Sequence, residues 1–267
     1  MNQNLNKYMQ EHLAAIQQKE LSILCAIHDI CERNKIDYWL DGGTCLGAVR
    51  HGGFIPWDDD IDIAMRKEDL PRFAEAAKRE LPEGLFLQTK ETDPTDPHPM
   101  LKIRDMNSLL VEYSDDFSQP YEKGLYVDIF PMIPYPNLSR AACKKITKNY
   151  CTANAILKKQ HKYSWRAVGK LFWFGAKRML FSSLWNISNI TMRKDIYYGN
   201  TLDENGYGIM HRMDSIFPTK PITFESKTFR GPANPDAYLT DLYKDYMQLP
   251  PEDKRKGHAA FYIEKLT

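Results

Sequence analysis

Residues 39–65 read WLDGGTCLGAVRHGGFIPWDDDIDIAM, with four acids inside the five positions from Asp58 to Asp62. From Asp60 to Ile63, polar and apolar residues alternate, which is the period of a half-buried strand. On such a strand Asp60 and Asp62 share one face, with Cα atoms about 6.5–7 Å apart. Because adjacent carboxylates repel each other, this pattern favours a site for one or two Mg²⁺ ions, with Mn²⁺ as an alternative.

The side chains of the two other acids in this run are expected to point to opposite faces of the strand. Asp58 has the same strand parity as Asp60 and Asp62, so we expect it to be a further metal ligand or to support the ligands. Asp59 has the opposite parity, and we expect it at the surface or as a capping acid.

Two glycines precede the acids and predict a phosphate site. Asp41 follows a strand expected over residues 36–40, and Gly42, Gly43 and Thr44 lead into a short helix expected over residues 46–50, with Thr44 as N-cap. Paired glycines let the backbone approach a ligand closely, and a helix N-terminus attracts phosphate. Alone, such a motif is more often a plain turn. Followed so closely by the acids, it favours binding of a phosphorylated ligand.

Three segments of this stretch, residues 39–44, 47–51 and 53–62, resemble the signature of the LicD family. The likeness is contiguous over residues 38–65 and continues more weakly from about residue 12 to residue 255. This family comprises bacterial phosphocholine transferases related to the fukutin group and to the nucleotidyltransferase superfamily. The resemblance implies an α+β fold, in which a nucleotidyltransferase-like mixed β-sheet is flanked by helices and carries a basic helical insertion.

The family resemblance also implies an activity. It is Mg²⁺-dependent transfer of phosphocholine from CDP-choline to a sugar hydroxyl of a lipid-linked teichoic-acid or other cell-surface glycan precursor, with release of CMP. Other members transfer other phosphoalcohols, so choline, ribitol and glycerol stay open, as does the acceptor sugar. Two alternative functions remain. One is a nucleotidyltransferase that moves NMP from an NTP, and the other is a non-catalytic module that binds a glycan precursor or a membrane.

A further acid, Asp128, lies in the apolar segment over residues 124–131, which reads as a strand. A lone carboxylate among apolar neighbours is costly to bury without a partner. The resemblance implies that Asp128 joins Asp60 and Asp62 in the catalytic site, as a metal ligand or as the base for the acceptor hydroxyl. The alternative is a strand-edge acid that faces water or pairs with Lys102 or Arg104.

The remaining candidate site residues are cations and aromatic residues near the motif. The cations would bind the phosphates of the donor, and the aromatic faces would surround the quaternary ammonium of choline. Taken one at a time, such residues are more often paired surface charges or part of the core. The cations are Arg50, His51, Lys102 and Arg104, and the aromatic residues are Trp39, Phe54, Trp57 and Tyr126.

Residues 138–195 form a basic section with interleaved aromatic residues. From Ser139 to Lys194 the chain has 13 of its 36 Lys and Arg residues and none of its 35 Asp and Glu residues. Basic, Trp-rich helices favour anionic membrane surfaces. Two interpretations stay open: contact with a membrane, or a helical subdomain with an aromatic core and solvated lysines. Nucleic acid would also attract such a section, but the carboxylate site argues against that partner.

The order of expected elements divides the chain into three parts. Residues 1–137 read as the catalytic core, residues 138–195 as the inserted helical layer, and residues 196–267 as a part that completes the core. A basic segment over residues 254–258 either reaches the donor phosphates or is simply solvated. Helices are expected over 8–33, 67–81 and 236–247, strands over 85–89, 100–104, 109–113, 125–130 and 222–229, and loops over most of 196–221.

Cysteine usage bears on the compartment. The five cysteines are odd in number and lack a Cys-x-x-Cys spacing, which favours reduced thiols over disulfides or a zinc cluster. The first residues are polar and do not form a signal-peptide pattern. We therefore expect a cytoplasmic protein, peripheral on the inner face of the membrane if residues 138–195 dock there.

Overall fold

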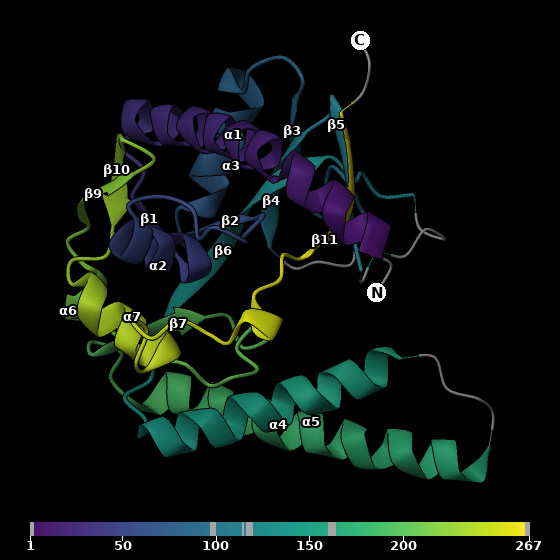
Figure 1. Ribbon diagram of the computed structural model, residues 1–267. Helices are drawn as coiled ribbons and strands as arrows, with labels where there is room; N and C mark the ends of the chain where they lie inside the picture. Colours follow the sequence, from purple (N-terminus) through teal and green to yellow (C-terminus); the bar gives the residue numbers. More distant parts are fainter. Residues whose placement is uncertain (1–2, 97–99, 114, 116–119, 160–163, 265–267) are drawn as a thin grey trace. The chain divides into compact units, whose positions relative to one another are not determined.

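The computed structural model describes residues 3–96, 100–113, 115, 120–159 and 164–264 (Figure 1). The chain divides into two compact units, one formed by residues 1–131 with 217–267 and the other by residues 132–216. Helices and strands are mixed along the chain without a regular alternation, so the α+β class expected from the sequence is confirmed.

A curled sheet flanked by helices forms the middle of the first unit. Its strands follow the order β1-β2-β6-β4-β3, and the pairs β1–β2, β6–β4 and β4–β3 are antiparallel. The order places β2, which carries Asp62, beside β6, which carries Asp128. These strands are β1 (Tyr38–Leu40), β2 (Ile61–Arg66), β3 (Leu85–Gln88), β4 (Leu101–Asp105) and β6 (Leu125–Tyr135).

The first helix, α1 (Gln3–Asn34), has the apolar face that the periodicity predicts, and it is longer than the helix expected over residues 8–33. Ile16, Leu24 and Ile27 on this face are fully buried. The helix contacts β2 and β4 of the sheet, as well as α3 (Leu70–Glu80). Through these contacts α1 lies behind the acidic segment of the motif.

Helix α2 (Gly42–His51) begins earlier than the helix expected over residues 46–50. Its N-cap is Asp41, whose Oδ1 accepts a hydrogen bond from the backbone N–H of Gly42 at 2.7 Å. The prediction that Thr44 caps the helix is therefore wrong. The buried Thr44 hydroxyl instead accepts a hydrogen bond from the backbone N–H of Asp62 at 2.8 Å, which ties α2 to β2.

The segment expected as one strand over residues 222–229 is a hairpin. Glu225 and Ser226 adopt positive φ angles of 49° and 61°, and this conformation turns the chain between β9 (Lys220–Phe224) and β10 (Lys227–Gly231). Neither residue is a glycine, so the sequence lacks the usual signal for such a turn.

The C-terminal segment adds a strand that the sequence does not predict. β11 (Ala259–Glu264) pairs antiparallel with β5 (Ser108–Glu112), outside the main sheet, and contacts α1. Before it, α7 (Pro235–Tyr243) ends earlier than the expected residue 247, and a single 3-10 turn follows at Glu252–Lys254.

The second unit is built on a helical hairpin of α4 (Arg140–Lys158) and α5 (Trp165–Thr191), which lie side by side (Figure 1). Trp185 of α5 packs edge-on against Tyr135, within a small core that includes Cys143. The segment expected as loops contains the short elements β7 (Tyr197–Asn200), β8 (His211–Arg212) and α6 (Met213–Ile216). Among the described residues, no helix is long and apolar enough to cross a membrane.

A buried hydrogen-bond chain fixes the start of α2. The Trp39 indole N–H donates to the Tyr238 hydroxyl at 3.1 Å, and this hydroxyl donates to Asp41 Oδ1 at 2.6 Å. Trp39 and Tyr238 are both fully buried. The N-cap of α2 is thus held in place by α7, almost 200 residues away in the sequence.

We expect Tyr238→Phe to lower the free energy of unfolding by about 1–3 kcal/mol, because it leaves a buried indole N–H and a buried carboxylate oxygen without this partner. Urea titration followed by circular dichroism measures the change. Tyr246→Phe is the matched control, since its hydroxyl donates to Asp236 at an exposed position. Equal stability of the wild type and Tyr238→Phe would contradict the importance of this chain.

Candidate functional site

A pocket of about 510 Å³ in the first unit gathers the motif residues. Helix α2 contributes Gly43 and Arg50, and the loop before β2 contributes Trp57. Three acids of the motif line the same cavity, two from this loop and one from β2, and Asp245 lines it from the segment after α7. The segment after α7 forms another side. The lining residues are Gly43, Leu46, Arg50, Ile55, Trp57, Asp58, Asp60, Asp62, Tyr243, Asp245, Tyr246, Gln248, Pro250 and His258.

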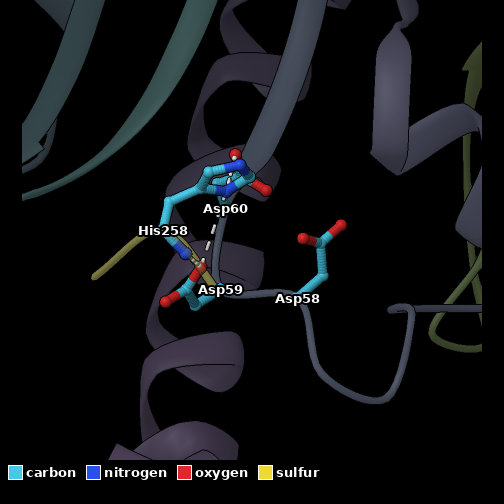
Figure 2. Close-up of side chains that lie close together, drawn as sticks. All are labelled: Asp58, Asp59, Asp60 and His258. Atoms are coloured by element: carbon cyan, nitrogen blue, oxygen red, sulfur yellow. Dashed lines mark hydrogen bonds and ion pairs between the residues drawn. The ribbon is translucent and has the colours of Figure 1, made fainter. Parts of the chain in front are cut away.

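The consecutive acids of the motif lie on the loop that leads into β2, and His258 approaches them from the start of β11 (Figure 2). His258 Nδ1 lies 3.0 Å from Asp60 Oδ2. The backbone N–H groups of His258 and Ala259 donate to the two carboxylate oxygens of Asp59, at 2.6 and 2.8 Å. The expectation that Asp59 lies at the surface is wrong, because Asp59 is 4% exposed and holds β11 against the acidic loop.

The charges of this cluster shift one another's protonation. Burial and the neighbouring Asp60 raise the pKa of Asp58 to about 8. The hydrogen bond to Asp60, together with its charge, raises the pKa of His258 to about 9. His258 is therefore an imidazolium at neutral pH, and its positive charge partly offsets the crowded carboxylates.

Asp62 lies deeper than Asp58 and is pressed against the start of α2. Burial, and then the charges of Asp60 and Asp128, raise its pKa well above the usual range. A Cβ atom at Gly42 would lie 3.0 Å from Asp62 Oδ2, and one at Gly43 would lie 2.8 Å from Asp58 Oδ2. Both glycines are thus needed for the carboxylates to approach the first turn of α2.

Asp128 is buried in the sheet behind this pocket and is not one of its lining residues. Its Oδ1 lies 2.6 Å from the Lys102 ammonium, which is itself 2% exposed. Burial raises the pKa of Asp128, and the Lys102 charge opposes that shift. Lys102 is one of the alternative partners that the sequence left open for Asp128. Asp62 lies on the neighbouring strand β2, and its pKa responds to the charge of Asp128.

Asp128 lies beside a buried group of side chains, which consists of Lys102, Arg104 and Tyr126. The Lys102 ammonium lies 3.6 Å from the centre of the Tyr126 ring, and the Arg104 guanidinium carbon lies 4.7 Å from it. Arg104 also donates to Gln88 and to the carbonyl of Gly124. These side chains are therefore engaged within the sheet, in contrast to Arg50 and Trp57, which line the pocket.

Glu20 of α1 is an acid that the sequence analysis missed. Its side chain is 1% exposed, and neither carboxylate oxygen has a hydrogen-bond partner among the described residues. Burial raises its pKa well above the usual range, and the charges of Asp60, Asp59, Asp58 and Asp62 add to the effect. Glu20 thus faces the acidic cluster from behind. Only its position on the apolar side of α1 could have indicated it.

Other pocket residues were also missed as site residues. Tyr243 and Tyr246 follow the helical period and read as apolar packing, yet both line the cavity. His258 was grouped with a basic segment, but its imidazole meets the acids. Conversely, Trp39 and Phe54 pack inside the fold, Trp39 edge-on against Phe217 and Phe54 against Phe224.

The acids of the pocket fit a divalent cation. An unpartnered buried carboxylate such as Glu20 is costly unless a positive charge or a proton compensates it. Carboxylate oxygens are ligands that Mg²⁺ and Mn²⁺ prefer. One group of donor atoms, from Asp58, Asp59, Asp60 and His258, lies within 4.8 Å of one another. His258 belongs to this group through a ring nitrogen, and the carboxylates supply its oxygen donors.

Comparison with known proteins agrees with this geometry. Residues 35–150 match the family model described as LicD/FKTN/FKRP, nucleotidyltransferase domain. The chain is 31% identical over 254 residues to the Lipopolysaccharide cholinephosphotransferase LicD of Haemophilus influenzae, which covers 89% of this chain and 92% of that protein. It is 49% identical over 41 residues to the human Ribitol 5-phosphate transferase FKRP, covering 15% of this chain and 8% of that protein.

The short match and the long match carry different weight. A match over 41 residues places the motif in a wider group, whereas the match to LicD extends over most of both chains. This protein is therefore a homologue of the cholinephosphotransferase LicD over most of its length and belongs to the LicD/FKTN/FKRP nucleotidyltransferase family.

Proposed function

We propose that this protein transfers phosphocholine from CDP-choline to a sugar hydroxyl of a cell-surface glycan precursor, such as a lipopolysaccharide or teichoic-acid precursor, and releases CMP. The observation that carries the proposal is the pocket lined by Asp58, Asp60 and Asp62, in a chain homologous to LicD over most of its length. The acceptor oxygen forms a bond to the phosphorus of phosphocholine as the bond to the CMP oxygen breaks.

Asp60 and Asp62 would hold Mg²⁺ or Mn²⁺, with Asp128 and Glu20 supporting them from behind. Such an ion, when bound, neutralises the phosphate oxygens and stabilises the charge on the leaving CMP. Three groups of this chain do the positioning. The Asp59 carboxylate anchors the loop through two backbone N–H groups, Thr44 holds the backbone of Asp62, and Gln17 Nε2 donates to the carbonyl of Asp58 at 2.8 Å.

The pocket offers two kinds of donor contact beyond the acids. The first turn of α2 and Arg50 supply positive potential to the diphosphate. Tyr243, Tyr246 and Trp57 supply aromatic faces for the choline cation. The Trp57 ring already makes a cation–π contact in this structure, because the Arg255 guanidinium carbon lies 5.1 Å from its centre. Arg255 also belongs to the basic segment expected near the phosphates.

Asp58 is a better candidate than Asp128 for the base that takes the proton of the acceptor hydroxyl. Asp58 lines the pocket, so its carboxylate is open to a bound acceptor hydroxyl. Asp128 lies behind the pocket in its ion pair with Lys102. In this arrangement Asp58 accepts the proton as the acceptor oxygen bonds to phosphorus.

Product analysis tests the reaction. Incubation with CDP-choline, Mg²⁺ and a lipopolysaccharide or teichoic-acid acceptor should release CMP and add phosphocholine to the glycan. Asp60→Asn and Asp62→Asn should each lower kcat/KM about 100-fold or more, because each removes a carboxylate from the ion. Asp253→Asn, the same change outside this pocket, is the control and should keep full activity. Release of pyrophosphate from an NTP would instead indicate nucleotidyl transfer.

Glu20→Gln tests the metal site by binding and stability together. At alkaline pH, where the Glu20 carboxyl would ionise beside the other acids, removing it should raise the melting temperature of the metal-free protein. The same variant should bind Mn²⁺ about 10- to 100-fold more weakly in a calorimetric titration, as for other groups that support metal ligands. Glu11→Gln, on an exposed turn of the same helix, should change neither quantity. Unchanged Mn²⁺ affinity in Glu20→Gln would remove Glu20 from the site.

The metal-free protein should lose stability as the pH rises from 5 to 9. The pKa of Asp58 is raised to about 8, so the folded state holds its proton where the unfolded state has lost it, and this stabilisation disappears through pH 8. The pKa of His258 is raised to about 9, so its contribution, complete below the unfolded pKa near 6.5, is lost through pH 9.

Thermal unfolding in EDTA across this pH range measures the effect. Adding Mg²⁺ should raise the melting temperature most at the alkaline end, where the carboxylates are ionised. A melting temperature in EDTA that stays constant or rises with pH would contradict the claim that the protein loses stability as Asp58 and His258 lose their protons.

A further inference from the structure

The outer face of helix α5 is apolar and exposed. Trp165 is 91% exposed, Ile190 84% and Phe172 80%, and more than half of Trp173 and Met179 is also accessible. Over the 27 residues of α5, only Trp185 is buried. Large apolar residues scattered singly on a surface are ordinary, but a contiguous set on one helix indicates a binding surface.

Helical geometry places four of these residues along one stripe of α5, which Ser183 interrupts between Met179 and Ile190. At about 100° per residue, Trp165, Phe172, Met179 and Ile190 fall within a narrow angle of one another, and they extend over about 38 Å of helix. The opposite side of α5 packs on α4 and contains Trp185, whose ring meets Tyr135. The stripe therefore lies on the side of α5 that faces away from the hairpin core.

Cations lie on a neighbouring side of α5. By the same geometry Arg166, Lys170 and Lys177 fall within a narrow angle of one another, beside Trp173 and about 100–160° around the helix from the stripe. The whole segment from Ser139 to Lys194 contains no acid. An apolar face with Trp and Phe, with Lys and Arg on a neighbouring side, is the pattern of helices that lie in the interface of a membrane.

We propose that the outer face of α5 docks on the surface of a bilayer containing anionic lipids, with the helix axis parallel to the membrane. The apolar side chains enter the boundary between headgroups and acyl chains, and the neighbouring cations meet lipid phosphates. The stripe shares no residue with the pocket of the first unit, and the proposal does not depend on the reaction assigned there.

Charge favours an anionic bilayer over a second copy of the chain as the binding partner of this face. A two-fold dimer through α5 would bring the same patch against itself, and with it two sets of cations and no acid to pair with them. An anionic bilayer supplies the opposite charge together with an apolar layer. The observations therefore favour lipid over self-association.

Co-sedimentation of the full-length protein with vesicles tests the proposal. Vesicles of phosphatidylcholine mixed with phosphatidylglycerol should bind the wild type, binding should weaken with added salt, and phosphatidylcholine alone should bind at least about tenfold less. A variant that keeps the charge but removes the apolar stripe should lose binding at least about tenfold. A control variant removes three exposed apolar residues elsewhere and should bind as the wild type does. The test variant is Trp165→Ser/Phe172→Ser/Ile190→Ser, and the control is Tyr207→Ser/Met247→Ser/Leu249→Ser.

Since all six residues are exposed, both variants should unfold at the temperature of the wild type, which thermal denaturation verifies. Absence of binding to the anionic vesicles would overturn the proposal, as would equal binding by the two variants. A dimer in light scattering that the test variant dissociates, without any vesicle binding by the wild type, would assign the face to a second copy.

Discussion

Repulsion between carboxylates is the constraint on which the first unit depends. Four acids of the motif occupy five positions of the chain, and the fold adds Asp128 from the neighbouring strand and Glu20 from α1. Each carboxylate taken from water makes its neighbours harder to ionise. His258, Lys102 and the backbone N–H groups at the start of β11 compensate part of this charge. The remainder favours a divalent cation, which is also what a diphosphate donor needs.

Contacts between distant parts of the chain build the site. Asp59 is held by the backbone of residues 258 and 259, and the capping acid Asp41 is held by Tyr238. Gln17 of α1 holds the carbonyl of Asp58. The acidic loop therefore reaches its final conformation only when the N-terminal helix and the C-terminal strand have both packed on it. Activity and global stability should be closely coupled in this protein for that reason.

The sequence predicted local structure better than tertiary contacts. The alternation from Asp60 to Ile63 marked β2 and Asp62 on it, because a period of two depends only on neighbouring residues, while Asp60 lies on the loop just before the strand. The glycines before the acids predict a close approach of a phosphorylated ligand to the backbone, and this stays a prediction. The structure brings both glycines against carboxylates. Local patterns of this kind are recorded in the sequence itself, and so is the apolar face of α1.

What the sequence could not predict depends on tertiary contacts. Asp59 alternates away from the other acids, yet it is buried because β11 supplies two N–H donors from the far end of the chain. In the sequence Glu20 is indistinguishable from any other acid on a helix, whereas in the structure its side chain is buried and has no hydrogen-bond partner within the described part of the chain. Thr44 has the composition of an N-cap, but Asp41 takes that position and leaves the threonine to hold β2. Helix-capping propensity does not distinguish Asp41 from Thr44 as the N-cap, because a tertiary hydrogen bond from Tyr238 favours Asp41.

Anomalous scattering from crystals grown with Mn²⁺ and CDP-choline is the most direct test of the central claim. The account predicts a Mn²⁺ peak bound by Asp60 and Asp62, on the side of Asp128, and in contact with the donor diphosphate. A metal bound elsewhere, or CDP-choline bound in this pocket without any metal at the acids, would contradict it.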